Sequence, residues 1–491
     1  MMRCRICFFL FIFSFLLFSN QSKHVLRIGI HNFPLTLNPV YVTDEVSQSV
    51  INKVFESLYY FNEAGEIRNG LVEKAVLNPD GKIIAIRLLS KRYFSNGKEF
   101  DAVDVVETFK LLKDRKTQFP YLSTLDFIDS IEQAGRYDIR LILKRKLAIW
   151  KNLLTFKILN SDEIEDINPK NFKNRMLTGT GPYRFEKINE PSMIVLNRNT
   201  YEKAESLFPV VEYSVITSTV MKPLKLLNDE IDICELQPED SDAYHRISQW
   251  RQTFSILRYK KFGYTYLIFN LRRLKLERNL RFIVYNSLIK DNFLKRFLKM
   301  RGEIVKTPFL LLNDEVDYVP LPATSLQKPV KLKILANSES KLRKEFILFF
   351  KQVLKRENII LEPVFLEYQM FLDSLKKGRF DLAVSGFLLD IDYDMKDVLY
   401  GGAYFNYSGY KDDRMDTLLD LGLKELDSQK RRRLYHRANE IWKAELPLIP
   451  LFNLYYYMGI SRQVRIPKRI CTLVGSTNDF LINITDWKTN R

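Results

Sequence analysis

Residues 380–394 read FDLAVSGFLLDIDYD, and this stretch decides the fold class. Its first part, up to residue 387, is apolar except for Asp381 and Ser385, a pattern typical of a strand that is buried on both faces. Carboxylates then follow at three alternate positions, Asp390, Asp392 and Asp394. The pattern predicts a buried strand whose carboxyl end carries a group of acidic side chains.

The segments just before this strand supply the other parts of a parallel sheet. Apolar or alternating runs at 330–335 and 359–365 predict strands, and apolar residues at helical spacing predict helices at 340–356 and 368–377. The order strand–helix–strand–helix–strand predicts parallel strands with right-handed crossovers. Ligands of open α/β sheets bind beyond the carboxyl ends of the strands, so Asp390 is expected to face a ligand.

Elsewhere the sequence predicts further elements of a mixed α/β chain. Strands are expected at 25–30, 82–89, 183–188, 193–198, 264–270 and 453–460. Helices are expected at 46–60, 279–290, 292–300, 412–426 and 428–444, and another that begins after a capping residue, Asp101. The glycine-rich segment at 179–182 lacks the lysine of a phosphate-binding loop and predicts a close backbone crossover.

The length of 491 residues is too great for one core and predicts two or three domains. A short basic start precedes residues 6–18 (ICFFLFIFSFLLF), which are nearly all apolar, and this layout predicts a secretory signal peptide over residues 1–22. An uncleaved membrane anchor is the alternative. No cysteine follows the apolar run, so no lipid attachment site is expected.

The formal net charge of +17 is spread along the chain, because lysines and arginines are interleaved with other residues throughout. Together with the export signal, this distribution favours solvated basic faces over a nucleic-acid surface. Beyond the signal, two cysteines remain, Cys234 and Cys471. An oxidising compartment would allow them to pair, and the sequence leaves that question open.

Catalytic and metal-binding motifs are absent from the sequence. No H-E-x-x-H or G-x-S-x-G pattern is present, and the four histidines are scattered. The aspartates at 390–394 resemble the start of an EF-hand loop, but Met395 replaces the required glycine and Gly401 the required glutamate. We therefore expect no metal site, no cofactor and no enzyme. Two roles for the aspartates stay open: capture of a cationic ligand group, or capping and pairing within the protein.

Nine short motifs, in one order along the chain, carry a resemblance to a known family. They are LTLNP (35–39), FESL (55–58), LVEKA…NPDG (71–81), FSNGKEFDAVDVV (94–106), TGTGPYRF (178–185), EIDI (230–233), LIFN (267–270), GYKDDRMDTLL (409–419) and LPLIPLF (446–452). The chain resembles the extracytoplasmic solute-binding proteins of ABC transporters, in the oligopeptide-, dipeptide- and nickel-binding family (family 5, cluster C). Two departures are Asn38, where the family usually has aspartate, and Phe387, where it usually has tryptophan.

The resemblance implies a bilobed periplasmic-binding-protein fold of type II, cluster C, with an extra small domain. Domain I would combine 24–50, 179–262 and 465–491. Domain II would span 51–178 and domain III 263–464. The ligand cleft would lie between domains I and III and close by a hinge motion.

The resemblance also implies a set of ligand-binding residues. Gly386, Phe387 and Leu388 would offer a backbone edge to an extended peptide, and Asp390 would hold its α-amino group. Asp392 is the alternative if the register slips by two. The remaining expected site residues are Thr43, Glu45 and Asn270.

The implied function is that of a periplasmic, monomeric protein that binds short peptides and delivers them to an ABC permease and ATPase complex. A second interpretation keeps the fold and replaces the peptide by a metal chelate, an opine or an oligosaccharide. A third, from a different class, is an exported hydrolase that uses the carboxylates at 390–394.

Overall fold

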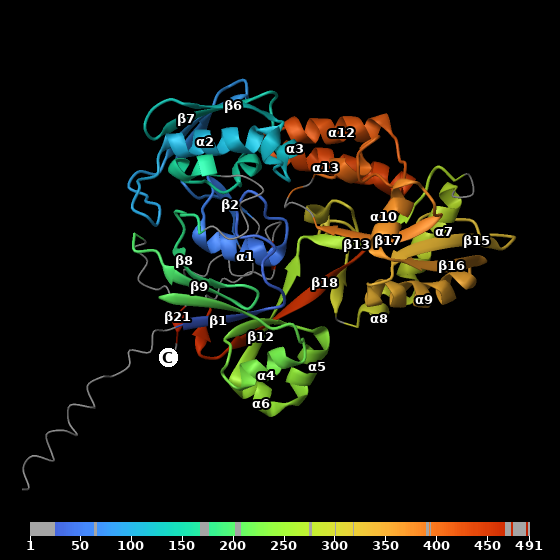
Figure 1. Cartoon of the computed structure of the whole chain (residues 1–491). Coiled ribbons are helices and arrows are strands. Elements are labelled where there is room, and N and C mark those ends of the chain that lie inside the picture. Colours follow the sequence, from blue (N-terminus) through green and yellow to red (C-terminus); the bar gives the residue numbers. More distant parts are fainter. Residues whose placement is uncertain are drawn as a thin grey trace, which may run out of the picture.

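The protein, described here as a computed structural model, is a mixed α/β chain whose elements gather into two lobes (Figure 1). The structure describes residues 25–62, 66–166, 176–201, 208–273, 277–299, 301–317, 319–388, 392, 394–466, 473–474 and 488–489. The expected signal peptide, Asp390 and Cys471 therefore lie outside the described residues. Across the described ranges, no helix combines the length and the apolar character needed to cross a membrane.

One sheet of 13 strands runs through both lobes. Its main path is β16 (Ile359–Leu366), β15 (Val330–Asn337), β17 (Leu382–Leu388), β13 (Gly263–Phe269), β18 (Leu448–Ser461), β11 (Ile233–Leu236), β1 (Val25–Ile30), β10 (Val210–Val215), β9 (Met193–Arg198) and β8 (Tyr183–Asn189). The strands β12 (Phe254–Lys261), β14 (Gly302–Ile304) and β20 (Leu473–Val474) join it off this path. We call the elements up to β12 the amino-terminal lobe and those from β13 to residue 445 the carboxyl-terminal lobe.

The parallel unit predicted around residues 330–388 is confirmed. β15 pairs in parallel with β16 on one side and with β17 on the other. The connecting helices are α9 (Lys341–Lys355) and α10 (Tyr368–Lys376), and Gly378 follows α10 with a φ of +62°. Asp381, the polar residue just before β17, has a structural role. One of its carboxylate oxygens accepts a hydrogen bond from the backbone N–H of Lys333 at 2.8 Å.

Strand β18 connects the two lobes and is longer than predicted. The sequence predicts that 447–452 leads into a strand at 453–460, whereas the strand begins at Leu448. Pro450 is tolerated because the pairing shifts there: Tyr266 faces Pro450 and Thr265 faces Phe452, so an extra residue forms a bulge. The far end of β18 pairs with β11 and β12, so a single strand belongs to both lobes.

The first helix is shorter than predicted. α1 (Glu45–Val54) ends at Val54, and the chain is extended at Phe55. The cause is a distant segment, since a methyl group on Gly179 would lie 2.0 Å from the Val54 carbonyl oxygen, and Gly181 donates its N–H to that oxygen at 2.8 Å. The predicted close crossover at 179–182 is thus confirmed, and it occupies the position where α1 would continue.

A second sheet lies in the amino-terminal lobe. Its order is β4 (Val72–Leu77), β5 (Ile83–Leu88), β7 (Asp138–Leu143) and β6 (Ile128–Gln133), all antiparallel. Helix α2 (Ala102–Lys113) packs against β6. Its predicted cap is confirmed, because Asp101 and Asp104 form a capping box.

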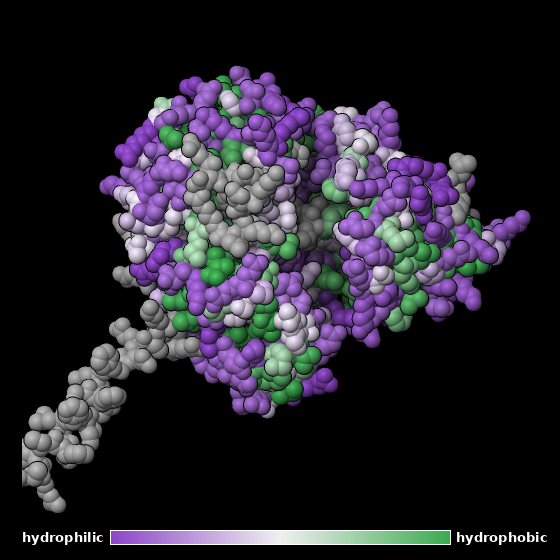
Figure 2. Space-filling view, viewed as in Figure 1, coloured by the Kyte–Doolittle hydropathy of each residue, from purple (hydrophilic) through white to green (hydrophobic). Residues whose placement is uncertain are grey.

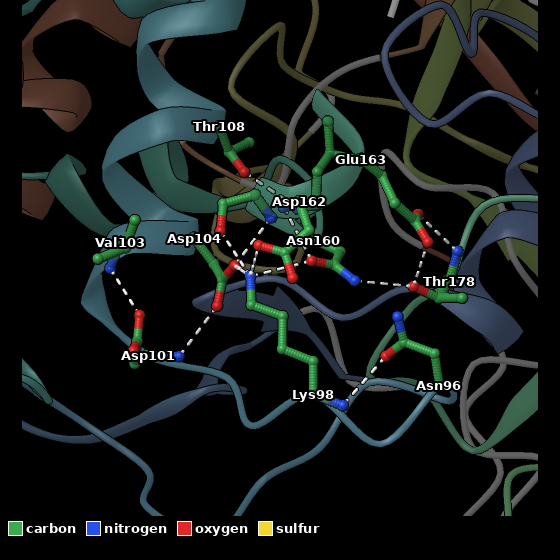
Figure 3. Close-up of polar contacts among 12 residues, drawn as sticks. Asn96, Lys98, Asp101, Val103, Asp104, Thr108, Asn160, Asp162, Glu163 and Thr178 are labelled. Atoms are coloured by element: carbon green, nitrogen blue, oxygen red, sulfur yellow. Dashed lines mark hydrogen bonds and ion pairs between the residues drawn. The ribbon is translucent and has the colours of Figure 1, made fainter. Parts of the chain in front are cut away.

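A polar network secures the start of α2 (Figure 3). The buried carboxylate of Asp104 receives the ammonium group of Lys98 at 2.6 Å, and the same ammonium donates to the side-chain oxygen of Asn160 at 2.9 Å. Asn160 donates to Thr178, which in turn bonds Glu163. The network therefore fixes the chain just before the glycine crossover that ends α1.

The remaining helices agree with the predicted positions to within a few residues. They are α7 (Arg278–Ile289), α8 (Phe293–Leu298), α12 (Asp413–Lys424) and α13 (Ser428–Glu445). Helix α4 (Met221–Leu227) ends just before 230–233, where the sequence indicates the end of a helix and the start of a strand. Short helices that the sequence left unassigned are α3 (Leu122–Leu125), α5 (Pro238–Arg246), α6 (Ser248–Thr253) and α11 (Lys396–Leu399). Small strand pairs complete the described elements: β2 (Tyr59–Phe61) with β3 (Ile67–Asn69), and β19 (Val464–Arg465) with β21 (Lys488–Thr489).

The buried apolar side chains form separate cores. One core draws its members from Tyr264 to Phe452, in the carboxyl-terminal lobe and β18. The largest other core lies in the amino-terminal lobe, and a small one surrounds Cys234, which is buried and unpaired within the described residues. The domain boundaries implied by the resemblance remain predictions.

Candidate functional site

A recess lies between the two lobes, which are connected at both of its ends. Figure 2 shows the surface hollowed between the amino-terminal and carboxyl-terminal lobes. β18 joins the lobes at one end, and at the other the N–H of Ala148 donates to the carbonyl of Leu423 at 2.7 Å. The lobes thus enclose the recess from two sides.

Strand β17 has a free backbone edge at its carboxyl end. On one side it pairs with β13 along its whole length, with Gly386 facing Thr265 and Leu388 facing Gly263. On the other side, pairing with β15 covers only Leu382 to Val384. Residues 385–388 therefore have no strand partner on that side within the described chain.

Arg343 stands over this free edge. It lies in the first turn of α9, and a methyl group on Gly386 would come within 2.5 Å of one of its terminal guanidinium nitrogens. Its neighbours are the phenols of Tyr266, Tyr456 and Tyr368, and burial lowers the pKa of the guanidinium. Arg343 makes no ion pair and no side-chain hydrogen bond with any described residue, so it is a cation available to a ligand carboxylate.

The sequence analysis did not identify Arg343. A signal was present, because the first turn of α9 is basic, with lysines flanking this arginine. Cations are unfavourable at a helix N-terminus, where the partial charge of the helix is positive. A basic first turn directly after a parallel strand therefore indicates a compensating anion.

Phe387 fills the space beside the free edge. Its ring centroid lies 4.9 Å from that of Tyr264 and 4.6 Å from that of Tyr266. The three rings form a compact aromatic wall on the neighbouring strands. Leu388 contributes its backbone to β17, and its side chain lies outside the description.

Of the three aspartates that follow β17, the structure describes Asp392 and Asp394. Asp390, the expected anchor of an α-amino group, lies outside the described residues. Asp392 is buried, and both of its oxygens meet the guanidinium of Arg431 in α13 at 2.6 Å. Burial alone would lower the pKa of Arg431, but the hydrogen bonds and charge of Asp392 outweigh it and raise that pKa. Asp392 therefore has an internal partner.

Asp394 is held differently. Burial, followed by the charge of Asp392, raises the pKa of its carboxyl to about 7. One carboxylate oxygen accepts the backbone N–H of Lys396 at 2.9 Å, just before α11. Of the two roles left open by the sequence, pairing and capping within the protein describe the contacts of Asp392 and Asp394.

Glu45 and Thr43 lie at the start of α1. Thr43 is exposed, and Glu45 forms an ion pair at 2.6 Å with Lys261 of β12. The ammonium of Lys261 also lies 4.3 Å from the ring centroid of Tyr456. Tyr456 has electrostatic interactions with Lys261, Glu45 and Arg343, so Glu45 and Arg343 act on the same phenol.

Asn270 has structural contacts. It is 1% exposed, and its side-chain nitrogen donates to the carbonyls of Gly378 and Phe380, both at 2.9 Å. These bonds join the end of β13 to the loop before β17. A ligand contact for Asn270 remains a prediction.

Two cavities lie away from the predicted residues. A groove of about 1070 Å³ is lined by residues of α5, β12, β18, α8 and α9, among them Tyr457 and Phe349. Tyr457 follows Tyr456 in β18, so this groove lies on the opposite face of the connecting strand from Arg343. A smaller pocket of about 410 Å³ lies beside residues 402–411. In the described ranges, no three His, Cys, Asp or Glu side chains are grouped closely enough to hold a metal ion.

Comparison with known proteins identifies the chain's relatives. Residues 66–287 match the family model of bacterial extracellular solute-binding proteins, family 5 middle region. The oligopeptide-binding protein AppA of Bacillus subtilis is 21% identical over 478 residues, which cover 89% of this chain and 87% of AppA.

Solved structures show the same fold. The ABC transporter substrate-binding protein CtaP of Listeria monocytogenes superposes with a TM-score of 0.83 at 18% identity, covering 95% of this chain and 99% of CtaP. NikZ of Campylobacter jejuni, solved in complex with Ni(L-His), gives a TM-score of 0.77 at 20% identity, covering 95% of this chain and all of NikZ. The expected resemblance is confirmed: residues 66–287 match the middle region of the bacterial extracellular solute-binding proteins of family 5, and the chain has the bilobed fold of the solved structures that it resembles.

Proposed function

We propose that this protein is the extracytoplasmic binding component of an ABC importer and that it holds a short peptide in the recess between its lobes. The relatives support a binding role, since AppA is named an oligopeptide-binding protein. The predicted export signal supports a periplasmic location. We propose no chemical reaction, and the partners would be an ABC permease and its ATPase.

The observation that carries this proposal is the free backbone edge at residues 385–388. An extended peptide can pair with such an edge as an added strand, which satisfies backbone groups whatever the peptide sequence. Gly386 leaves room beside the guanidinium of Arg343, because it has no side chain. This arrangement suits a ligand with a regular backbone better than a compact solute.

Arg343 and Asp390 supply the second argument, from charge. A free peptide carries a carboxylate at one end and an ammonium group at the other. Arg343 offers the first a guanidinium that has no ion-pair partner among the described residues, and Asp390 is the predicted partner of the second. Thr43 and Glu45 would face the peptide from the start of α1.

A chelated metal is the second candidate ligand. NikZ, which shares the fold, was solved with Ni(L-His), and histidine in such a chelate also carries a carboxylate. Arg343 could bind that carboxylate without any protein atom touching the metal. The two candidates make different predictions for a metal-free peptide whose C-terminus is an amide.

The test begins with mass spectrometry of small molecules released when the purified protein is denatured. A mixture of short peptides is expected. Release of a single metal chelate would instead identify the chelate as the ligand. Calorimetry then compares a peptide with its C-terminal amide in wild type, in Arg343→Gln and in the control Lys344→Gln.

Arg343→Gln is expected to weaken the free-acid peptide at least tenfold, or about 1.4 kcal/mol. It should leave the amide unchanged, because the amide has no carboxylate to lose. Lys344→Gln removes the same charge from the next residue and should change neither affinity. If each peptide binds Arg343→Gln as tightly as it binds wild type, Arg343 does not bind the ligand carboxylate.

A further inference from the structure

The carboxyl-terminal lobe places one apolar side chain in the core of the other lobe. Leu423, near the end of α12, is 5% exposed and packs in the main core of the amino-terminal lobe. Among the described residues of the carboxyl-terminal lobe, it alone belongs to that core. The other buried leucines of α12, Leu418 and Leu419, pack in the core of their own lobe. Helix α12 therefore divides its apolar face between the two lobes.

The backbone at Leu423 also connects the lobes. Its carbonyl lies in the last turn of α12, where a helix offers no N–H of its own as a partner. The N–H of Ala148 supplies this donor at 2.7 Å. Leu147, next to Ala148, is buried in the same core that receives the Leu423 side chain. The contact thus combines a buried leucine with a hydrogen bond that caps its helix from the other lobe.

The end of α12 is held firmly within its own lobe. The Nε of Arg431 in α13 donates to the carbonyl of Gly422 at 2.8 Å, and the same guanidinium pairs with Asp392. A methyl group on Gly422 would lie 2.6 Å from the ring of Tyr435, so α12 and α13 approach closely here. Asp392 comes shortly after the edge of β17. Leu423 and the edge proposed to bind the ligand are therefore parts of one connected unit.

The contact lies at the end of the recess away from β18. In Figure 1, α12 reaches the amino-terminal lobe there, and the hydrogen bond from Ala148 marks the meeting point. At the β18 end the two lobes share a strand, whereas at this end they meet through noncovalent contacts. A separation of the lobes at this end has to withdraw Leu423 from the core. That withdrawal is unfavourable, because it exposes the leucine and its apolar neighbours to water.

We propose that Leu423 and the end of α12 form a latch that holds the two lobes together over the recess when no ligand is bound. A ligand then enters and leaves through a minor open form, in which Leu423 is withdrawn from the amino-terminal lobe. The latch slows binding and prolongs the stay of a bound ligand, because both steps wait for the same opening. The inference concerns the motion of the lobes and holds for either candidate ligand.

The experiment measures the distance between the lobes with spin labels in protein dialysed free of small molecules. Labels are attached to Lys74→Cys in β4 and Lys355→Cys in α9, two exposed positions on different lobes. The cysteines outside the described residues are replaced by serine, and the buried Cys234 is kept. Double electron–electron resonance then reports the closed and open forms as separate distances.

Wild type is expected to show one main distance, with the open form at roughly 10% or less. Leu423→Ala should raise the ratio of open to closed form at least tenfold, or about 1.4 kcal/mol, because it removes the buried side chain. Leu421→Ala shortens a leucine of the same helix that is 46% exposed, and it should leave the ratio unchanged. Leu418→Ala shortens a leucine buried in its own lobe, so it should lower the melting temperature without opening the lobes.

A predominantly open wild type would overturn the latch, and so would a Leu423→Ala protein with the distances of wild type. Equal opening in Leu418→Ala would assign the effect to a general loss of packing in α12 and would overturn it as well. Thermal unfolding verifies that each variant is folded. If Leu423→Ala does not fold, Leu423→Val decides by the same criterion, with an expected shift of about threefold. Because no ligand is added, these results leave the proposed function standing.

Discussion

The acidic turn at 390–394 and the guanidinium of Arg343 use charge in opposite ways. In the acidic turn, the described carboxylates are satisfied by the protein, Asp392 by Arg431 and Asp394 by a backbone N–H. Beside the edge of β17, Arg343 has no acidic partner among the described residues. A charged residue can therefore serve the fold or remain available to a ligand, and its contacts in space distinguish the two.

The buried pair gives the largest expected effect. Arg431→Met leaves the Asp392 carboxylate buried without its cation, which should lower the free energy of unfolding by about 3–5 kcal/mol. Urea unfolding measures this value. The exposed Arg433→Met should change it by less than about 0.5 kcal/mol. Equal stability of Arg431→Met and wild type would show that the acidic turn does not depend on internal pairing.

Asp394 should make stability depend on pH. Its pKa is raised to about 7 in the folded protein, so the folded state holds the proton more tightly than the unfolded state. That stabilisation is complete below about pH 4 and is lost as the pH rises through about 7. Stability should therefore fall across this range in wild type.

Asp394→Asn mimics the protonated acid and keeps an acceptor for Lys396. The full difference between the two pKa values corresponds to about 4 kcal/mol. Partial exposure of the residue reduces the expected gain at pH 8 to about 2 kcal/mol. Chemical unfolding at pH 5 and pH 8 measures the change, with Asp314→Asn as an exposed control. A wild-type-like pH profile in Asp394→Asn would show that another group titrates.

Gly386→Ala tests the position of the Arg343 guanidinium without removing a charge. The added methyl group would meet a terminal nitrogen of Arg343 at 2.5 Å and displace the guanidinium from the edge of β17. Because a flexible side-chain end can move, stability should change little, whereas peptide affinity should fall about fivefold, or about 1 kcal/mol. Calorimetry and thermal unfolding separate the two effects. A large loss of stability with unchanged affinity would place the guanidinium in a structural role.

The smallest effect is expected at Glu45. Glu45→Gln removes the charge that faces the buried ammonium of Lys261 but keeps an oxygen that can accept its hydrogen bond, so it should cost less than about 1 kcal/mol in stability. Peptide affinity is the sharper measurement, because Glu45 is a predicted ligand residue. An unchanged affinity would limit Glu45 to holding Lys261.

The two regions also show how far the sequence predicts this protein. The unit from β15 to β17 was predictable because its strands and helices follow local apolar periodicity. The end of α1 was not, because apolar residues continue past Val54 while the glycines that stop the helix lie more than a hundred residues later. The early start of β18 was not predictable either, because the bulge that accommodates Pro450 depends on the partner strand.

The residues of the candidate site also differ in whether the sequence predicts them. Gly386 and Phe387 were predictable from the buried strand and the resemblance, and the carboxylates from their spacing. Arg431, which neutralises Asp392, and Arg343, which stands over Gly386, follow neither from spacing nor from a motif. Their roles depend on which distant side chains meet, and only the folded chain shows that.

The continuity of β18 has a mechanical consequence. Up to Leu454 this strand of 14 residues is paired with β13 and β14, and from Tyr455 onward it is paired with β12 and β11. A relative rotation of the lobes therefore falls on the few dihedral angles where the partner strands change. A rotation of about 20° is within the ordinary scatter of a residue in regular structure. The compliance of this joint should therefore be a local property, more sensitive to substitutions near Leu454 and Tyr455 than to substitutions elsewhere in the strand.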